Sequence, residues 1–119
     1  MKSYKELEVW KKSKDLVLMI YNLTKEFPKE ELYGITNQIR RAAVSVPANI
    51  AEGHGRNYSK ETIQYLHVSR GSLFEIETLI IISSELKYIE QKITENLLNL
   101  IIECIKMLNG LITYFRTKR

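Results

Sequence analysis

The sequence has little cysteine, proline or glycine. Its 119 residues include one cysteine, Cys104, so the chain cannot form an intramolecular disulfide, and a single thiol fits a reducing compartment. Two prolines, five glycines and no low-complexity run exclude collagen-like and disordered chains. The two histidines, His54 and His67, form no HxxH, HExxH or Cys/His cluster. We therefore expect no metal site and no cofactor.

Long hydrophobic runs are also absent. The longest uncharged apolar stretch, Leu79 to Ile82, is far shorter than the roughly 20 residues of a membrane-spanning helix. The charged N-terminus is not followed by the apolar segment that is typical of a signal peptide. We therefore expect a cytoplasmic protein that makes no contact with a membrane.

What the sequence does contain is apolar residues at helical spacing. They recur at three- and four-residue steps in four segments, 5–26, 33–53, 59–87 and 93–115, and no segment predicts a strand with comparable clarity. Pro28 ends the first segment, and Gly53 and Gly55 end the second. The chain is short enough for one domain, 1–119, and we predict an all-α fold, an antiparallel up-and-down four-helix bundle.

The fourth segment has more apolar residues than one face of a bundle can bury. Its expected core stripe includes Ile93, Leu97 and Cys104, and a second set lies beside that stripe: Leu98, Ile101, Ile102, Ile105 and Ile112. In the third segment, residues 79–82 are consecutive apolar residues that point all round the helix. Exposed apolar patches of this size favour association, so we predict a homo-oligomer. The alternative is that the bundle's own grooves bury everything.

The polar residues of the second and third segments are unusual in their placement. Arg41, Asn49 and Glu52 fall on the side of the second segment opposite its apolar stripe, and Pro47, within it, predicts a kink. In the third segment, Arg70 and Glu77 interrupt an apolar stripe, so we expect either that Glu77 contacts Arg70 or Arg41 or that these charges lie in a subunit interface. We interpret these five charged or amide residues as a structural polar network rather than an active site. Cys104 lies among isoleucines and is expected to be a buried, unreactive thiol.

The charge of the chain is weakly basic, with a net charge of +4. Lysines cluster near the N-terminus, at positions 2, 5, 11, 12 and 14, and the chain closes on Arg116, Lys118 and Arg119. If the first and last helices lie side by side, these ends merge into one basic patch that would attract phosphate. The alternative is that they are ordinary solvated helix ends.

Several motifs together resemble a known family. They are Leu7-Glu8-Val9-Trp10, Phe27-Pro28, Tyr33-Gly34, QIRRAAVSVPANIAEG at 38–53 and GSLFEIET at 71–78. The chain is similar over nearly its whole length to the bacterial four-helix-bundle proteins encoded in intervening sequences of 23S rRNA genes, and it resembles more distantly the accessory protein of diversity-generating retroelements. The resemblance implies an up-and-down bundle that assembles as a ring-shaped homopentamer.

The same resemblance bears on individual residues. Arg40, Arg41, Asn49, Glu52 and Arg56 match family positions, although no function is established for them in the family. The sequence departs from the family pattern at Thr62, at Gln64, which removes a frequent basic residue, and at Lys87, which stands where a glycine is usual before Tyr88.

Two functional hypotheses follow. The first is a non-enzymatic, pentameric adaptor that binds the backbone of RNA or DNA through basic helix ends. The alternative is an oligomeric scaffold that binds another protein and makes no contact with nucleic acid. The residues predicted to contact nucleic acid are Lys11, Lys12, Lys14, Arg40, Arg41, Arg56, Arg116, Lys118 and Arg119.

Overall fold

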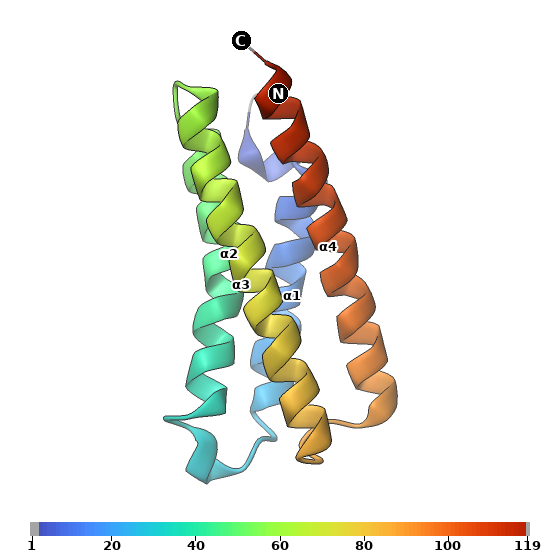
Figure 1. The fold of residues 1–119 in the computed structure, drawn as a ribbon. Coiled ribbons are helices and arrows are strands. Elements are labelled where there is room, and N and C mark those ends of the chain that lie inside the picture. Colours follow the sequence, from blue (N-terminus) through green and yellow to red (C-terminus); the bar gives the residue numbers. More distant parts are fainter. Residues whose placement is uncertain (1–2, 119) are drawn as a thin grey trace.

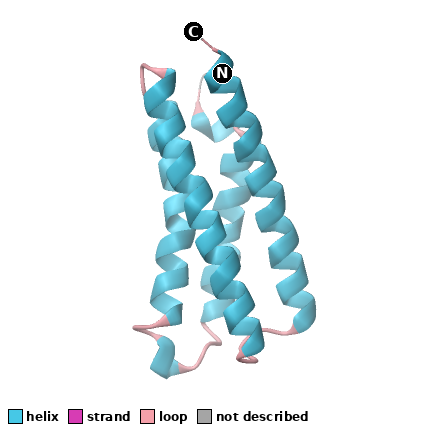
Figure 2. Ribbon diagram, in the orientation of Figure 1, coloured by secondary structure: helices cyan, strands magenta, loops and turns pink. Residues whose placement is uncertain are grey.

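The computed structural model describes residues 3–118, which consist of helices and connecting loops without a strand (Figure 2). The helices are η1 (Tyr4–Glu6), α1 (Glu8–Thr24), η2 (Lys29–Glu31), α2 (Ile35–His54), α3 (Ser59–Glu85) and α4 (Gln91–Thr117), of which η1 and η2 are short 3-10 helices. The predictions of an all-α fold and of four long helices are confirmed. The first helix is shorter than predicted, because the buried Leu7 has an extended backbone and separates η1 from α1.

The four long helices lie side by side in an elongated bundle of 48 × 24 × 20 Å (Figure 1). The first and last described residues and the α2–α3 connection lie at one end, here called the terminal end (Figure 1). The α1–α2 and α3–α4 connections lie at the other, the connection end (Figure 1). Within residues 3–118, α1 packs on α2, α2 on α3, α3 on α4 and α4 on α1, whereas neither diagonal pair of helices makes close backbone contact. The α1–α2 and α3–α4 sides are therefore opposite sides of the bundle.

The contact between α2 and α3 is the closest of these. The Thr62 hydroxyl donates to the carbonyl of Gly53 at 2.9 Å, and the Ser69 hydroxyl donates to the carbonyl of Val46 at 2.9 Å, so these two helices run in opposite directions. A Cβ added at Gly53 would lie 2.8 Å from Cβ of Tyr65. Glycine at position 53 therefore lets the two helices approach at the terminal end.

The core runs the length of the bundle. On α4 the buried positions differ in part from those that the sequence predicted. Ile101 and Ile112, expected beside the core stripe, are fully buried, whereas Ile93, expected within the stripe, is 38% exposed. The bundle thus covers part of the apolar surplus by itself. Ile102 stays 42% exposed, as do Ile81 at 42% and Ile82 at 41% on α3.

Helix α2 continues as α-helix on both sides of Pro47, which lies within it. Proline has no N–H to donate, so one intrahelical hydrogen bond is missing there. The predicted kink stays a prediction. The small residues near Pro47 have two environments: Ala42 and Ala43 are buried in the core, whereas Ala48 is exposed and Ala51 half-buried on the side that faces α1.

The C-terminal end of α3 is closed by a left-handed residue. Lys87 has φ of 69°, the N–H of Lys87 donates to the carbonyl of Ser84, and that of Tyr88 donates to the carbonyl of Ser83. This is the Schellman arrangement, in which glycine is the usual left-handed residue. Tyr88 then packs on the ring of Phe27, and its hydroxyl donates to the carboxylate of Glu31 at 2.9 Å. That hydrogen bond raises the pKa of Tyr88 above its ordinary value.

Helix α4 is the one helix of residues 3–118 that is long and apolar enough to cross a membrane, with a mean hydropathy of 1.4 in its most apolar window. The mean hydropathy of this window was not expected from the sequence, in which every uncharged apolar run is short. A core helix of a soluble protein has the same composition, so the finding is weak evidence for a membrane. In this bundle α4 buries one complete face, from Thr94 to Ile112.

Candidate functional site

The terminal end brings several predicted basic residues together. Helices α1 and α4 are in contact, and the first and last described residues lie at the same end of the bundle (Figure 1). Arg56 in the α2–α3 connection, Arg116 at the end of α4 and Lys118 just after it are exposed there. Arg119 lies outside the described residues, as does Lys2 of the N-terminal cluster.

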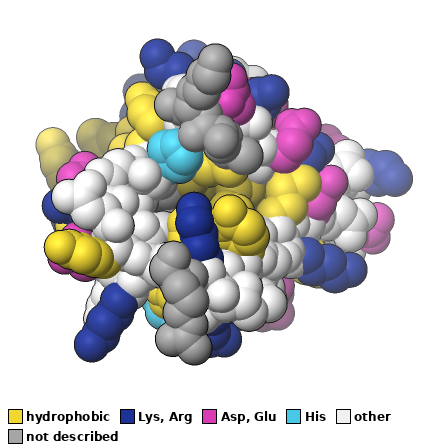
Figure 3. Space-filling view, turned by 90° about the horizontal axis from the view of Figure 1, so that it is seen from above, with side chains coloured by type: hydrophobic (Ala, Val, Ile, Leu, Met, Phe, Trp, Pro, Cys, Tyr) yellow, Lys and Arg dark blue, Asp and Glu magenta, His cyan; other side chains and the backbone are white. Residues whose placement is uncertain are grey.

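A cavity of about 550 Å³ opens at this end, here called the terminal pocket. Figure 3 looks onto the end and shows hydrophobic side chains at the bottom of a hollow, with a histidine and basic side chains at its edge. Four separate parts of the chain line the pocket: Leu7, His54, Arg56, Thr62, Leu111, Tyr114, Phe115 and Lys118. None of these lining residues is acidic.

The two strong cations of the terminal pocket are held by aromatic neighbours. Arg56 donates from Nη2 to Glu52 and to the hydroxyl of Tyr65, both at 2.7 Å, and its guanidinium lies 4.7 Å from the centre of the Tyr65 ring. The ammonium of Lys118 lies 5.5 Å from the ring centre of Tyr114 and 5.8 Å from that of Phe115. Contacts with ring faces orient a cation without removing its charge.

The other predicted basic residues have varied surroundings. Lys12 pairs with Glu103 and Lys14 with Asp15, each at 3.4 Å, whereas Lys11 is exposed and has no ion pair with a described residue. Arg40 lies farther down the bundle, where it donates to the hydroxyl of Thr24 at 2.7 Å and stacks on Tyr21. The predicted residues therefore do not form one continuous basic surface.

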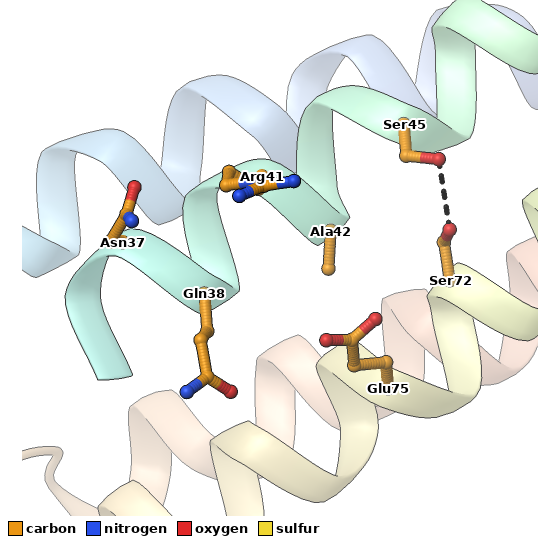
Figure 4. A pocket seen from close by; sticks show the side chains of 7 residues that line it. All are labelled: Asn37, Gln38, Arg41, Ala42, Ser45, Ser72 and Glu75. Carbon is orange, nitrogen blue, oxygen red and sulfur yellow. Dashed lines mark hydrogen bonds between the residues drawn. The ribbon is translucent and has the colours of Figure 1, made fainter. Parts of the chain in front are cut away.

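A second hollow lies on the outer side of the α2–α3 contact and is polar (Figure 4). Its volume is about 380 Å³, and it is lined by Asn37, Gln38, Arg41, Ala42, Ser45, Ser72 and Glu75. The hydroxyl of Ser72 donates to that of Ser45 at 3.0 Å, which also accepts from the amide of Asn49 at 3.0 Å. Arg41 and Glu75 are exposed beside this hydrogen-bonded chain, and neither has an ion pair within residues 3–118.

The predicted structural polar network does not form within the described chain. Arg70 donates instead to Asn109 at 2.6 Å and to the ring of His67 at 2.8 Å, so it joins α3 to α4. The side-chain amide of Asn49 donates to the carbonyl and the hydroxyl of Ser45, and Glu52 pairs with Arg56. Glu77 is half-buried without a hydrogen bond or ion pair to any residue of 3–118, so the expected pairing with Arg70 or Arg41 is not made within the bundle. The alternative, placement of Glu77 in a subunit interface, stays a prediction. The side chain of Arg70 thus contacts α4 through Asn109 and its own helix through His67.

Comparison with known proteins shows the family of the chain. The sequence model of the 23S rRNA-intervening sequence protein family matches residues 5–110. The chain belongs to this family. A crystal structure at 1.70 Å of a protein of unknown function from the S23 ribosomal protein family of Bacteroides thetaiotaomicron VPI-5482 has a TM-score of 0.82 and 26% identity, covering 88% of this chain and 95% of the other. No curated protein matches the sequence.

Two of the motifs that resemble the family lie against each other in the structure. Residues 38–53 form most of α2 and residues 71–78 part of α3, and the bond between Ser45 and Ser72 joins them (Figure 4). The polar hollow is thus formed largely by family-like segments. Sequence reasoning assigned Arg41 to a network with Glu77, whereas the acid that lines the same hollow is Glu75.

Two apolar faces of this bundle remain exposed, on opposite sides. On the α1–α2 side, an apolar groove of about 330 Å³ is lined by residues that include Trp10 and Pro47, with Leu18 62% and Val44 43% exposed. On the α3–α4 side, Phe74 and Ile81 lie one and about three turns beyond Arg70 on the flank of α3 that faces α4, 49% and 42% exposed. Ile102 lies on the matching flank of α4, two turns from Asn109.

The remaining reactive groups do not form a reaction site within residues 3–118. Burial raises the pKa of the Cys104 thiol to about 11, so this thiol is protonated at neutral pH, as expected of a buried cysteine. The described histidines, cysteine and carboxylates include no cluster that could hold a metal ion. Sequence reasoning missed the apolar half of the terminal pocket, because Leu7, Tyr114 and Phe115 read locally as ordinary core residues.

Proposed function

We propose that the protein is a non-enzymatic, cytoplasmic adaptor that assembles from several copies and binds the phosphate backbone of RNA or DNA through its terminal end. The observation that carries the proposal is the separation of charge along the bundle. In the terminal half, formed by residues 3–16, 47–66 and 103–118, Lys and Arg outnumber Asp and Glu. In the other half the acids outnumber the bases by one, and the connection end holds both signs of charge: Glu26, Glu30, Glu31, Glu85, Glu90 and Glu95 beside Lys25, Lys29, Lys87 and Lys92. A phosphate backbone is therefore attracted more strongly to the terminal end than to the connection end.

Assembly is supported by the two exposed apolar faces, for which the occupant that we propose is a second copy of the chain. The faces lie on opposite sides of one bundle, so the α3–α4 face of one copy can dock on the α1–α2 face of the next. Such a contact is heterologous, and repeating it gives a closed ring or an open filament. The family resemblance favours the ring, and a pentamer.

Assembly of this kind would strengthen binding to nucleic acid. Both faces run along the bundle, so copies related by rotation about an axis parallel to the helices keep the same direction. All terminal ends then lie on one side of the ring. Several weak basic ends that act on one strand give an avidity that a single weakly basic bundle lacks.

The assembly is tested first, by native mass spectrometry and light scattering. We expect Leu18→Glu and Phe74→Glu each to reduce the number of subunits, because each change places a charge in a proposed contact. Ile82→Glu is the matched control, since Ile82 is similarly exposed, at 41%, but lies on the outward side of α3. A wild-type protein that stays monomeric at high concentration contradicts the assembly.

The nucleic-acid contact is tested by a salt titration of binding to an RNA and a DNA duplex. Binding to the backbone weakens log-linearly with added salt, with a slope that reports the number of phosphates contacted. We expect Lys11→Glu with Lys118→Glu to abolish binding, and Lys12→Glu with Lys14→Glu to weaken it less, because these lysines already have acidic neighbours. A response that is flat with salt, or no binding at low salt, refutes the nucleic-acid contact.

A second candidate function is a protein scaffold that makes no contact with nucleic acid. It is favoured by the polar hollow between α2 and α3, which lies on neither apolar face and stays open in the proposed ring. Arg41 and Glu75 offer a cation and an anion there to a partner protein. If the protein assembles but shows no salt-dependent binding of nucleic acid, this function is the better one.

A further inference from the structure

We propose that the terminal pocket binds one unpaired nucleotide, so that the protein selects single-stranded over double-stranded nucleic acid. The inference rests on the proposed function and adds the class of strand to it. It depends on three properties of the pocket: an apolar and aromatic wall, cations without an acidic neighbour in the lining, and a volume that suits one nucleotide.

The wall of the pocket offers a surface on which a base can stack. Tyr114 is 53% exposed, and its ring meets that of Phe115 edge to face, with ring centres 5.0 Å apart. Leu7 and Leu111 continue the apolar surface. Base stacking on aromatic side chains is the common means by which proteins hold single strands, since every base has a π-face.

The edge of the pocket offers groups for the phosphate. Both side-chain hydrogen bonds of Arg56 within the described chain use Nη2, so the donors on Nη1 and Nε are left for a ligand. Lys118 stands beside the aromatic wall, and the imidazole of His54 is a further polar group in the lining. Glu52, which pairs with Arg56, does not line the pocket.

The size of the pocket and its mixed lining favour a nucleotide over a bare phosphate. About 550 Å³ lies within the range of pockets for small organic molecules. Inorganic phosphate would leave the apolar wall uncovered. In a duplex both faces of each inner base are stacked, so entry into the pocket would first require unpairing.

The experiment compares fluorescence anisotropy of a 5′-labelled ten-nucleotide single strand with that of the same strand annealed to its complement. We expect tighter binding of the single strand at equal salt. Tyr114→Ala should weaken single-strand binding by about 5- to 100-fold, as loss of one stacked base does, and leave duplex binding unchanged. Tyr114→Phe should retain the binding, and Tyr58→Ala is the matched control, because Tyr58 is 69% exposed at the same end but does not line the pocket.

Competition identifies the ligand. Adenosine 5′-monophosphate should displace the single strand, whereas adenosine or inorganic phosphate at the same concentration should not. Displacement by octanoate as effective as that by the nucleotide would overturn the assignment, since it would indicate a general site for apolar anions. Equal binding of single strand and duplex, unchanged by Tyr114→Ala, would refute the inference and leave the proposed function intact, whereas absence of both kinds of binding would refute both.

Discussion

Replacement of Lys87 by glycine should make the protein more stable. Lys87 is the residue with positive φ among the non-glycine residues of 3–118, and it ends α3 in the Schellman arrangement, with the N–H groups of Lys87 and Tyr88 bonded to carbonyls in the last turn. Its side chain is exposed, so the substitution removes no core contact. The change therefore isolates the backbone conformation.

The expected gain follows from two opposing costs. A left-handed backbone costs a residue with a Cβ about 1–2 kcal/mol, a cost that glycine does not have. Glycine loses more conformational freedom on folding, which costs about 0.5–1 kcal/mol. The difference is a gain of about 0.5–1 kcal/mol, which for a chain of this size corresponds to a rise in Tm of about 2–4 °C.

The assay is urea unfolding followed by circular dichroism at 222 nm, at one fixed protein concentration so that self-association affects all variants alike. Lys87→Ala removes the same charge but keeps a Cβ, so it should gain nothing. Lys92→Gly, in the exposed first turn of α4, should lose about 0.5–1 kcal/mol. If Lys87→Gly is no more stable than Lys87→Ala, the left-handed backbone carries no measurable strain and the reasoning is wrong.

Other substitutions test the packing of the helices and the buried polar groups. Gly53→Ala should lower stability by about 1–3 kcal/mol through the clash with Tyr65, whereas Gly71→Ala, with nothing within 4 Å, should raise it by about 0.5–1 kcal/mol; equal effects would refute the close approach of α2 and α3. Ser83→Ala should be neutral or stabilising in denaturant unfolding, because its buried hydroxyl has no hydrogen-bond partner in the described part of the chain. Ser69→Ala should lose about 1 kcal/mol with its bond to Val46. The raised pKa of Cys104, about 11, predicts a stability that falls as pH rises from about 9 to 11, since the unfolded chain loses the thiol proton first; Cys104→Ala should reduce that slope, and an unchanged slope would contradict the assignment.

The sequence predicted more of the fold than of the sites. The helices were predictable because the signals are local: apolar residues recur every three or four positions, Pro28 stops the first helix, and glycines follow the second. The same locality explains the errors. The spacing places Ile101 and Ile102 on neighbouring sides of α4 but does not say which side meets the core.

What the sequence by itself determined is therefore the helical class of the fold, the approximate helix bounds, the buried thiol and, through its motifs, the family. Only the tertiary structure decided which polar side chains meet, as when Arg70 donates to Asn109 on α4 and Glu77 has no ion pair among residues 3–118. It also decided that Leu7, Arg56, Thr62 and Tyr114 line one pocket. The physical reason is that helix formation depends on residues within one or two turns. Side-chain pairing and pockets depend instead on how the helices are rotated relative to one another, and that rotation is determined by the packing of all four helices together.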